Sequence, residues 1–279
     1  IRHRTGSMTA NKKSYSIPFI LWIIAGTVIP LASIAYYGFT SREGGFTFAN
    51  IAAMFRDDHM QALGLSLSLA LISTAICLVL AFPMAMVLRE SKYGKQGFLI
   101  FVIILPMWMN FLLRTYAWMT LLERNGLINR FFGLFGIGPF EMINTQGAVI
   151  LGMVYDFLPY MVMPIYTCIS KIDKHMWEAA SDLGCTPVQT LMKVILPLSM
   201  SGIISGVTMV LVPSISTFYI SQKLGGGSFD LIGDTIERQF QNQVTYHTGA
   251  AVSLVMMILI LISLAIMNKF SDNEEEIIV

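Results

Sequence analysis

Six long apolar stretches dominate this sequence, and they leave few folds open to it. About 20 apolar residues are enough for an α-helix to cross the hydrocarbon core of a bilayer. The stretches that qualify are Ile17–Phe39, Ala62–Leu88, Phe98–Leu122, Gln146–Ile169, Leu196–Ile220 and Gly249–Met267. Charged residues make up only 13% of the chain, well below the share of about 25% usual in soluble domains. We therefore predict an all-α membrane protein with six transmembrane helices.

The distribution of lysine and arginine predicts which side of the membrane each loop faces. Cytoplasmic loops of membrane proteins carry an excess of these residues. With the N-terminus inside, the cytoplasmic segments hold eleven of them and the outer loops hold six. Residues 1–7 have the character of a cloning remnant ahead of a natural start at Met8; without them the cytoplasmic count is nine. We expect both termini to be cytoplasmic and residues 8–279 to form a single transmembrane domain.

The loop between the fourth and fifth stretches, at about residues 171–190, is the most informative one. Apolar and small residues recur there at helical spacing, which predicts a short amphipathic helix. These residues are Ile172, Met176, Ala179, Ala180 and Leu183. Gly184 is placed to end this helix in a left-handed cap, and Thr186 or Pro187 could begin another. Such an elbow suits docking to a partner protein, which the small residues at 179, 180 and 184 would let approach closely. An interfacial helix lying on the lipid is the alternative.

The same loop carries a sequence motif. Glu178-Ala179-Ala180 is followed after three residues by Gly184, and after nine more by Val194-Ile195-Leu196-Pro197. This pattern resembles the EAA motif of ATP-binding-cassette (ABC) importer permeases, and it departs only in having valine where isoleucine is usual. The resemblance implies the type I importer permease fold, with this loop forming a cytoplasmic coupling helix that sits in a groove of the ATPase. The residues that it assigns to coupling are Glu178, Ala179, Ala180, Asp182, Leu183 and Gly184.

Other segments resemble the spermidine/putrescine branch of that family. They are Pro106–Tyr116, Leu158–Pro164 and the outer-loop residues Gly225-Gly226-Gly227, Leu231-Ile232-Gly233, Ile236 and Gln239-Phe240. This resemblance implies that the chain moves polyamines into a bacterial cell through the inner membrane. A permease for another small solute, such as sulfate, iron(III) or thiamine, is the alternative within the family.

The resemblance also implies a set of partners. They are a second, unlike permease subunit, two ATPase subunits, an extracytoplasmic polyamine-binding protein and membrane lipid. The chain has no GxxxxGK[ST] motif, so the partner ATPase would bind ATP and Mg²⁺. We expect no cofactor, metal ion or catalytic residue on this chain, and at a net charge of +1 no nucleic-acid partner.

Two ionisable residues, Arg114 and Asp156, fall inside predicted spans, where each costs about 2.5–3.5 kcal/mol at the centre. At 1.5 Å per residue they lie roughly 12 Å and 15 Å from the outer ends of their spans. They could therefore form a structural ion pair, or Asp156 could meet a cationic amine of the substrate. Nearby aromatic faces would attract alkylammonium groups, although helix packing or a lipid belt explains any single ring equally well. The pathway candidates are Trp108, Asn110, Arg114, Tyr116, Tyr155, Asp156, Tyr160, Ser214, Ser216, Thr217 and Tyr219.

Three classes of protein remain at this point: an ABC importer permease, an ion-driven secondary transporter, and a membrane scaffold without transport. A secondary transporter needs no EAA loop and usually shows paired repeats with broken helices. Co-purification separates the three, because only the first class would bring down an ATPase with a P-loop.

Overall fold

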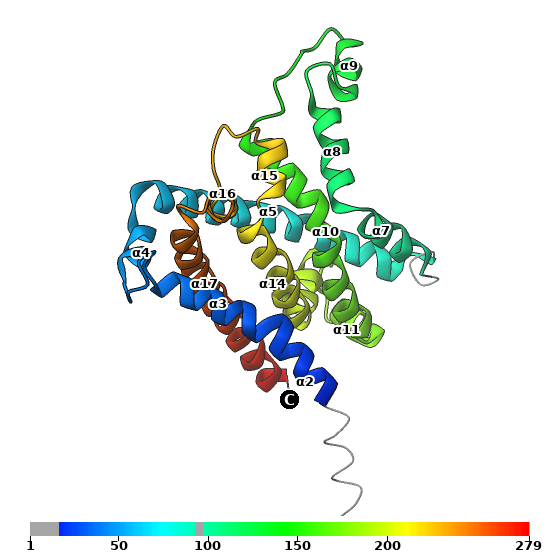
Figure 1. Ribbon diagram of the computed structural model, residues 1–279. Helices are drawn as coiled ribbons and strands as arrows, with labels where there is room; N and C mark the ends of the chain where they lie inside the picture. Colours follow the sequence, from blue (N-terminus) through cyan, green and yellow to red (C-terminus); the bar gives the residue numbers. More distant parts are fainter. Residues whose placement is uncertain (1–16, 93–96, 279) are drawn as a thin grey trace, which may run out of the picture. The chain divides into compact units, whose positions relative to one another are not determined.

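The computed structural model describes residues 17–92 and 97–278, with side chains described up to Lys269. The suspected remnant, residues 1–7, and Met8 lie outside the described residues. Figure 1 shows the helices of the chain, coloured along the sequence. Contacts divide the chain into two compact units. Unit 1 comprises Ile1–Arg56 and Ile236–Ile258, and unit 2 comprises Asp57–Thr235 and Leu259–Val279.

The described residues form helices joined by turns, which confirms the all-α membrane fold. Four helices are long and apolar enough to cross a membrane, and two bent pairs bring the number to six if each pair is one span. The four are Ile17–Phe39 (α2 Ile17–Ile23, the π-helical η1 Ile24–Val28 and α3 Ile29–Phe39), α5 Asp57–Glu90, α10 Gln146–Lys171, and Tyr246–Lys269 of α17 Tyr246–Ile278. The bent pairs are α7 Phe98–Trp108 with α8 Phe111–Leu122 and α9 Leu127–Gly133, and Pro187–Leu198 (α12 Pro187–Thr190, η3 Leu191–Ile195 and α13 Leu196–Leu198) with α14 Met200–Ser216. The remaining elements are α4 Ala49–Ala52, η2 Ala53–Phe55, α11 Lys174–Asp182, α15 Tyr219–Leu224 and α16 Ile232–Gln241.

The third predicted span is not one straight helix. Its two halves, α7 and α8, are bent by 91°. Met109 is extended between them, and the Asn110 side chain caps α8 by accepting a hydrogen bond from the backbone N–H of Leu112 at 2.8 Å. Asparagine is among the preferred N-cap residues, and Pro106 lacks the N–H that would complete the last turns of α7. The span predicted over Phe98–Leu122 therefore consists of two helices that meet at a sharp bend.

The fifth predicted span is broken at both ends. Ser199 separates α13 from α14, with a bend of 69° between the flanking helices. Thr217 is extended and ends α14, so that Tyr219 begins the separate helix α15. Gly233 packs against this break, since a Cβ there would lie 2.6 Å from the carbonyl oxygen of Thr217. The fifth transmembrane helix thus ends at Ser216, and the prediction that it runs to Ile220 was wrong.

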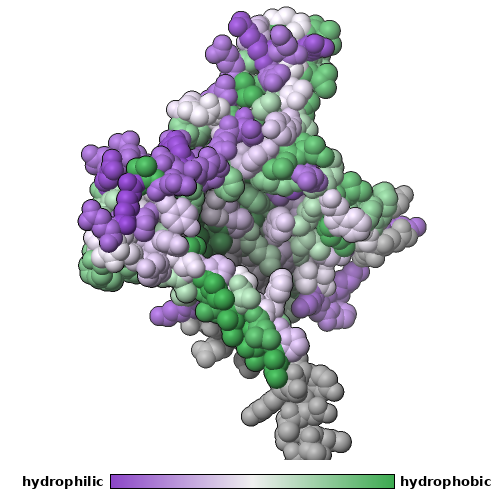
Figure 2. Space-filling view, in the orientation of Figure 1, coloured by the Kyte–Doolittle hydropathy of each residue, from purple (hydrophilic) through white to green (hydrophobic). Residues whose placement is uncertain are grey.

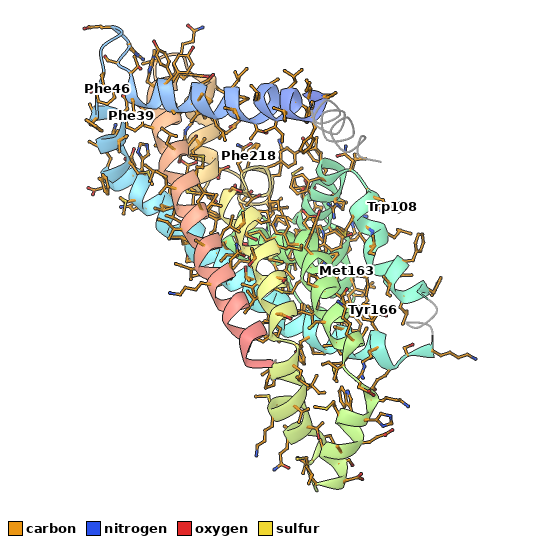
Figure 3. All side chains as sticks on the ribbon, turned by 90° about the horizontal axis from the view of Figure 1, so that it is seen from below. Phe39, Phe46, Trp108, Met163, Tyr166 and Phe218 are labelled. Carbon is orange, nitrogen blue, oxygen red and sulfur yellow. The ribbon has the colours of Figure 1, made fainter. Side chains whose placement is uncertain are left out.

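Unit 1 presents an apolar face outward. No residue of α2 is buried, and Phe19, Leu21 and Trp22 are 66%, 60% and 75% exposed. Figure 2 shows this hydrophobic band along α2. Within the unit, α3 packs on the first part of α17 through Gly38, whose missing Cβ leaves room for Leu254. The aromatic rings of Phe39 and Phe46 stack at 5.8 Å (Figure 3). An apolar helix surface of this kind suits contact with lipid.

Unit 2 has its core between α5, α10 and α14, which pack against each other. Helix α10 begins at a Thr145 cap, where Oγ1 accepts from the N–H of Ala148 at 3.1 Å. Two glycines of α14, four residues apart, let it approach α10 closely. A Cβ at Gly202 would lie 2.8 Å from the carbonyl oxygen of Pro164, and one at Gly206 would lie 3.1 Å from that of Met161. Small residues at such spacing are the usual means of close helix packing in membranes.

We expect Gly202→Val to lower the free energy of unfolding by about 1–3 kcal/mol, the usual cost of overpacking. The added side chain would push on the backbone of α10, which cannot move as a flexible side chain can. Thermal unfolding of the detergent-purified protein measures the effect. Gly64→Val in α5 is the control, because a Cβ at Gly64 meets nothing within 4 Å. Equal losses in the two variants would contradict this packing role.

Candidate functional site

The predicted elbow is present between α10 and α14. Its first helix is α11, which begins at Asp173, whose carboxylate accepts a hydrogen bond from the N–H of His175 at 3.0 Å. Its second helix is α12, where Thr186 and Gln189 form a capping box and Pro187 occupies the first turn. Both helix starts therefore use residues suited to cap a helix.

Gly184 makes the turn between the two helices. Its φ of +80° lies in the left-handed region, which glycine adopts at low cost. The N–H of Gly184 donates to the carbonyl of Ser181 at 2.9 Å, and that of Cys185 donates to the carbonyl of Ala180 at 3.0 Å. This is the Schellman pattern of helix termination. The structure thus confirms the left-handed glycine cap predicted from the sequence.

The elbow exposes apolar side chains. Leu183 and Val188 are 85% and 69% exposed, and Met176 is 45% exposed. Ala179 and Gly184 are exposed as expected, but Ala180 is only 5% exposed. The prediction that Ala180 presents itself to a partner was wrong, because α11 turns that side toward its own chain. Glu178 and Asp182 are exposed, and Glu178 Oε2 lies 3.0 Å from His175 Nδ1 on the same helix.

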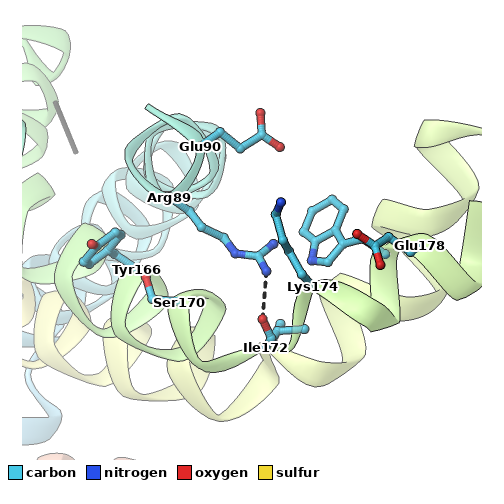
Figure 4. A pocket seen from close by; sticks show the side chains of 8 residues that line it. Arg89, Glu90, Tyr166, Ser170, Ile172, Lys174 and Glu178 are labelled. Carbon is cyan, nitrogen blue, oxygen red and sulfur yellow. Dashed lines mark hydrogen bonds between the residues drawn. The ribbon is translucent and has the colours of Figure 1, made fainter. Parts of the chain in front are cut away.

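Arg89 fixes the start of the elbow to the end of α5. Its Nη2 donates to the carbonyl of Ile172 at 2.7 Å (Figure 4). Its guanidinium carbon lies 4.7 Å from the ring centroid of Trp177, within range of a cation–π interaction. Both residues border a cavity of about 590 Å³. Arg89 therefore links the end of α5 to the start of the elbow and to α11. Sequence reasoning did not single out Arg89, because nothing in the sequence links residue 89 to residues 172 and 177.

We expect Arg89→Met to raise the hydrogen–deuterium exchange of the α11 amides by about tenfold or more. A hydrogen bond from a charged group contributes about 1.5–3 kcal/mol, and about 1.4 kcal/mol corresponds to a factor of ten. The control is Lys92→Met, which removes an exposed base beyond the same end of α5. Unchanged protection of α11 in Arg89→Met would show that the contact does not hold the elbow.

The two ionisable residues at membrane depth meet. Arg114 Nη1 lies 3.1 Å from Asp156 Oδ1, and the residues are only 7% and 3% exposed. The contact is poorly aligned for hydrogen bonding: Arg114 Nε and Nη1 and Asp156 Oδ1 have no hydrogen-bond partner among the described residues. This geometry favours the interpretation that Asp156 pairs with Arg114 over the interpretation that Asp156 binds only the substrate. The guanidinium of Arg114 and the carboxylate of Asp156 can therefore each form a further hydrogen bond.

Several aromatic candidates gather around α8, α10 and α15. The rings of Tyr116 and Tyr219 are 6.3 Å apart, and Phe111 lies 5.8 Å from Tyr219. Trp118 contacts Tyr155 at 5.3 Å. The rings of Tyr116 and Tyr219 both lie near the same cation, the Nζ of Lys223. Lys223 was missed as a site residue, although its position four residues after Tyr219 could have suggested a shared helix face.

Tyr160 lies elsewhere in unit 2. It borders a cavity of about 640 Å³ between α10 and α14, together with Met163, Cys168 and Lys171. Its ring lies 6.5 Å from that of Phe157. The cavity is lined on both sides by the helices that carry the close glycine contacts, so its shape depends on their packing.

The other candidates do not join a common site. Trp108, labelled in Figure 3, is 79% exposed at the end of α7, and Asn110 caps α8. Ser214 and Ser216 donate to carbonyls of their own helix, at 2.6 Å to Val210 and 3.2 Å to Val212. Thr217 is buried at the end of α14. The two serine hydroxyls therefore have local partners, as is common for serine in membrane helices.

The apolar helices and the exposed helix–glycine–helix elbow fit a multi-span permease of the importer class. The chain belongs to the family of binding-protein-dependent transport system inner membrane components, whose family model matches residues 92–274. It is accordingly a multi-pass inner-membrane transport subunit. This membership favours the importer over the secondary transporter and the scaffold.

Comparison with individual proteins agrees with this assignment. The chain is 36% identical over 250 residues to a spermidine/putrescine transport system permease of Escherichia coli K12, covering 87% of this chain and 91% of the relative. It is 34% identical over 267 residues to the protein of that name from Haemophilus influenzae, covering 92% and 93%. The fold matches a chain of a bacterial ABC transporter involved in the import of alginate, with a TM-score of 0.79 at 16% identity, covering 95% and 97%. A second structure, in complex with an alginate-bound periplasmic protein, gives a TM-score of 0.78, also at 16% identity, covering 93% of each chain.

Proposed function

We propose that this chain is a transmembrane permease subunit of an ABC importer that moves polyamines, spermidine or putrescine, into the cell. The observation that carries the proposal is its 36% identity, over most of both chains, to spermidine/putrescine permeases. The alginate importers share the fold but too little sequence to bear on the substrate.

The chemistry of unit 2 supports a cationic substrate. A buried carboxylate, Asp156, lies at membrane depth beside an arginine with which it is imperfectly aligned. The rings of Tyr116 and Tyr219 offer faces that attract alkylammonium groups. A polyamine is a chain of such groups, and its ammonium could take part of the charge interaction that Arg114 now makes with Asp156.

In the proposed assembly, partner subunits provide ATP hydrolysis and substrate capture. The assembly contains a second, unlike permease subunit, two ATPase subunits that bind ATP and Mg²⁺, and an extracytoplasmic polyamine-binding protein. The elbow at α11 and α12 docks on one ATPase through Leu183, Val188 and Met176. No cofactor is proposed on this chain.

The test is ATP hydrolysis by the purified complex in lipid, with the binding protein and a panel of substrates. Spermidine or putrescine should stimulate hydrolysis and be taken up, whereas sulfate, iron(III) and thiamine should not. Stimulation by one of the other solutes, without a response to any polyamine, would assign the importer to that solute. Failure to co-purify an ATPase would contradict the importer assembly itself.

The proposed orientation places both termini in the cytoplasm. We expect a cysteine at Lys92 to react with an impermeant maleimide only from the cytoplasmic side, and one at Arg124 only from outside. Both positions are exposed, whereas Asp234 in the outer loop is 6% exposed and would label poorly. The native Cys77, Cys168 and Cys185 are first replaced by serine. Labelling of both sites from outside would overturn the orientation.

A further inference from the structure

The ammonium group of Lys223 lies close to two tyrosine rings. Its Nζ lies 5.4 Å from the ring centroid of Tyr116 and 5.7 Å from that of Tyr219. Both distances fall within about 6 Å, the range in which an aromatic face attracts a cation. Among the residues that the structure describes, no carboxylate forms an ion pair with Lys223. The two tyrosines, through their ring faces and through a side-chain hydrogen bond between Lys223 and Tyr116, are therefore the groups that hold this ammonium in the structure.

The lysine is presented from a fixed helix. On α15, Ser221 Oγ donates to Asp234 Oδ2 at 2.7 Å, and the N–H of Leu231 donates to the same oxygen at 2.9 Å. Burial raises the pKa of Asp234 above its ordinary value. On the other side, Ile220 and Leu224 are fully buried in the core of unit 2. The side of α15 that carries Tyr219 and Lys223 thus keeps its position, and Tyr116 beside it is 42% exposed.

The chemistry of Lys223 is that of the substrate class. A lysine side chain is four methylenes that end in a primary ammonium, and a polyamine ends in the same group. Two ammonium groups held by the same pair of rings would repel each other at close range. A substrate ammonium and Lys223 therefore compete for the same rings.

We propose that Lys223 is an internal occupant of an alkylammonium site formed by Tyr116 and Tyr219, and that an incoming substrate ammonium displaces it. The proposal rests on the polyamine function proposed above. Lys223 then sets the affinity of the permease: it keeps the ring pair filled in the absence of substrate and weakens the binding of any amine that must replace it.

The test measures equilibrium binding of radiolabelled spermidine to the purified complex of permease and ATPase subunits without the binding protein. In Lys223→Met the dissociation constant should fall about two- to fivefold, the factor expected from a cation–π interaction at a partly exposed site. Lys223→Arg keeps a cation over the rings and should bind as the wild type does. An unchanged or raised dissociation constant in Lys223→Met would overturn the proposal.

A second arm asks whether the rings mediate the effect. In a Tyr116→Leu, Tyr219→Leu background, Lys223→Met should no longer change the dissociation constant, since nothing remains for the two ammonium groups to share. An equal improvement in that background would show charge repulsion at a distance and would also overturn the proposal. If Lys223→Met does not assemble, Lys223→Gln carries the same comparison. A wild-type complex that neither binds nor transports polyamine would instead refute the proposed function, so the two failures are distinct.

Discussion

Asp156→Asn is expected to lower the free energy of unfolding of the membrane-embedded chain by about 3–5 kcal/mol, the usual cost of removing one partner from a buried ion pair. The reason is the arginine left behind: Arg114 is 7% exposed, and Asp156 is the carboxylate with which the structure pairs it. Arg114→Gln should cost a similar amount by stranding the carboxylate. Thermal unfolding of the purified protein and the yield of assembled complex measure both effects.

The double variant Arg114→Gln, Asp156→Asn separates a structural pair from a substrate contact. If the residues serve only each other, neutralising both should restore most of the stability, and so should exchanging them. If Asp156 also meets the substrate amine, the restored double variant should need a higher polyamine concentration for uptake. A stable Asp156→Asn single variant with unchanged uptake kinetics would contradict both interpretations and place the residue on a hydrated face.

Gly184→Trp is expected to leave the chain in the membrane while reducing coupled uptake by tenfold or more. A residue with a side chain is strained at φ +80°, by about 1–2 kcal/mol. Apart from Gly184 and its two chain neighbours, no atom of the described residues lies within 4 Å of the Cβ position, so a bulky side chain would project from the elbow toward any docking partner. Hydrolysis should continue without a matching rise in transport, and the ratio of ATP hydrolysed to polyamine taken up measures this.

Gly227→Trp is the matched control for that experiment. Gly227 has φ +73° and equally open surroundings, but it lies between α15 and α16, in a loop that the proposed orientation places outside the cell. It shares the backbone strain without sharing the proposed ATPase contact. Gly184→Asn adds a second comparison, because asparagine tolerates the left-handed conformation better than other residues do. If both tryptophan variants lose coupling equally, the effect comes from strain and not from docking at the elbow.

The existence of the transmembrane helices could be predicted from the sequence because the hydropathy of a segment indicates whether it is more stable in lipid or in water. The elbow could be predicted for a different reason: Asp173, Gly184 and Thr186 act on backbone groups within a few residues of themselves. Local hydrogen bonding of this kind depends on residues that are adjacent in the sequence. The first span, Ile17–Phe39, and the start of the fourth, Gln146, agree with the structure for these reasons.

The interiors of the third and fifth spans were decided by tertiary structure. Hydropathy carries no information on the direction of the helix axis. An apolar segment bent by 91° at Met109 and Asn110 therefore has the same hydropathy as a straight helix. The break at Thr217 packs on Gly233, which lies sixteen residues further along the chain.

Contacts between distant segments were equally out of reach. The sequence placed Arg114 and Asp156 at similar depth, but only the packing of α8 against α10 decided that they meet. Arg89 at Trp177 and Lys223 between Tyr116 and Tyr219 also depend on how helices pack. What a residue does to its own backbone is fixed locally, whereas what its side chain meets is set by neighbouring helices that pack closely only where small residues such as Gly202 and Gly206 permit it.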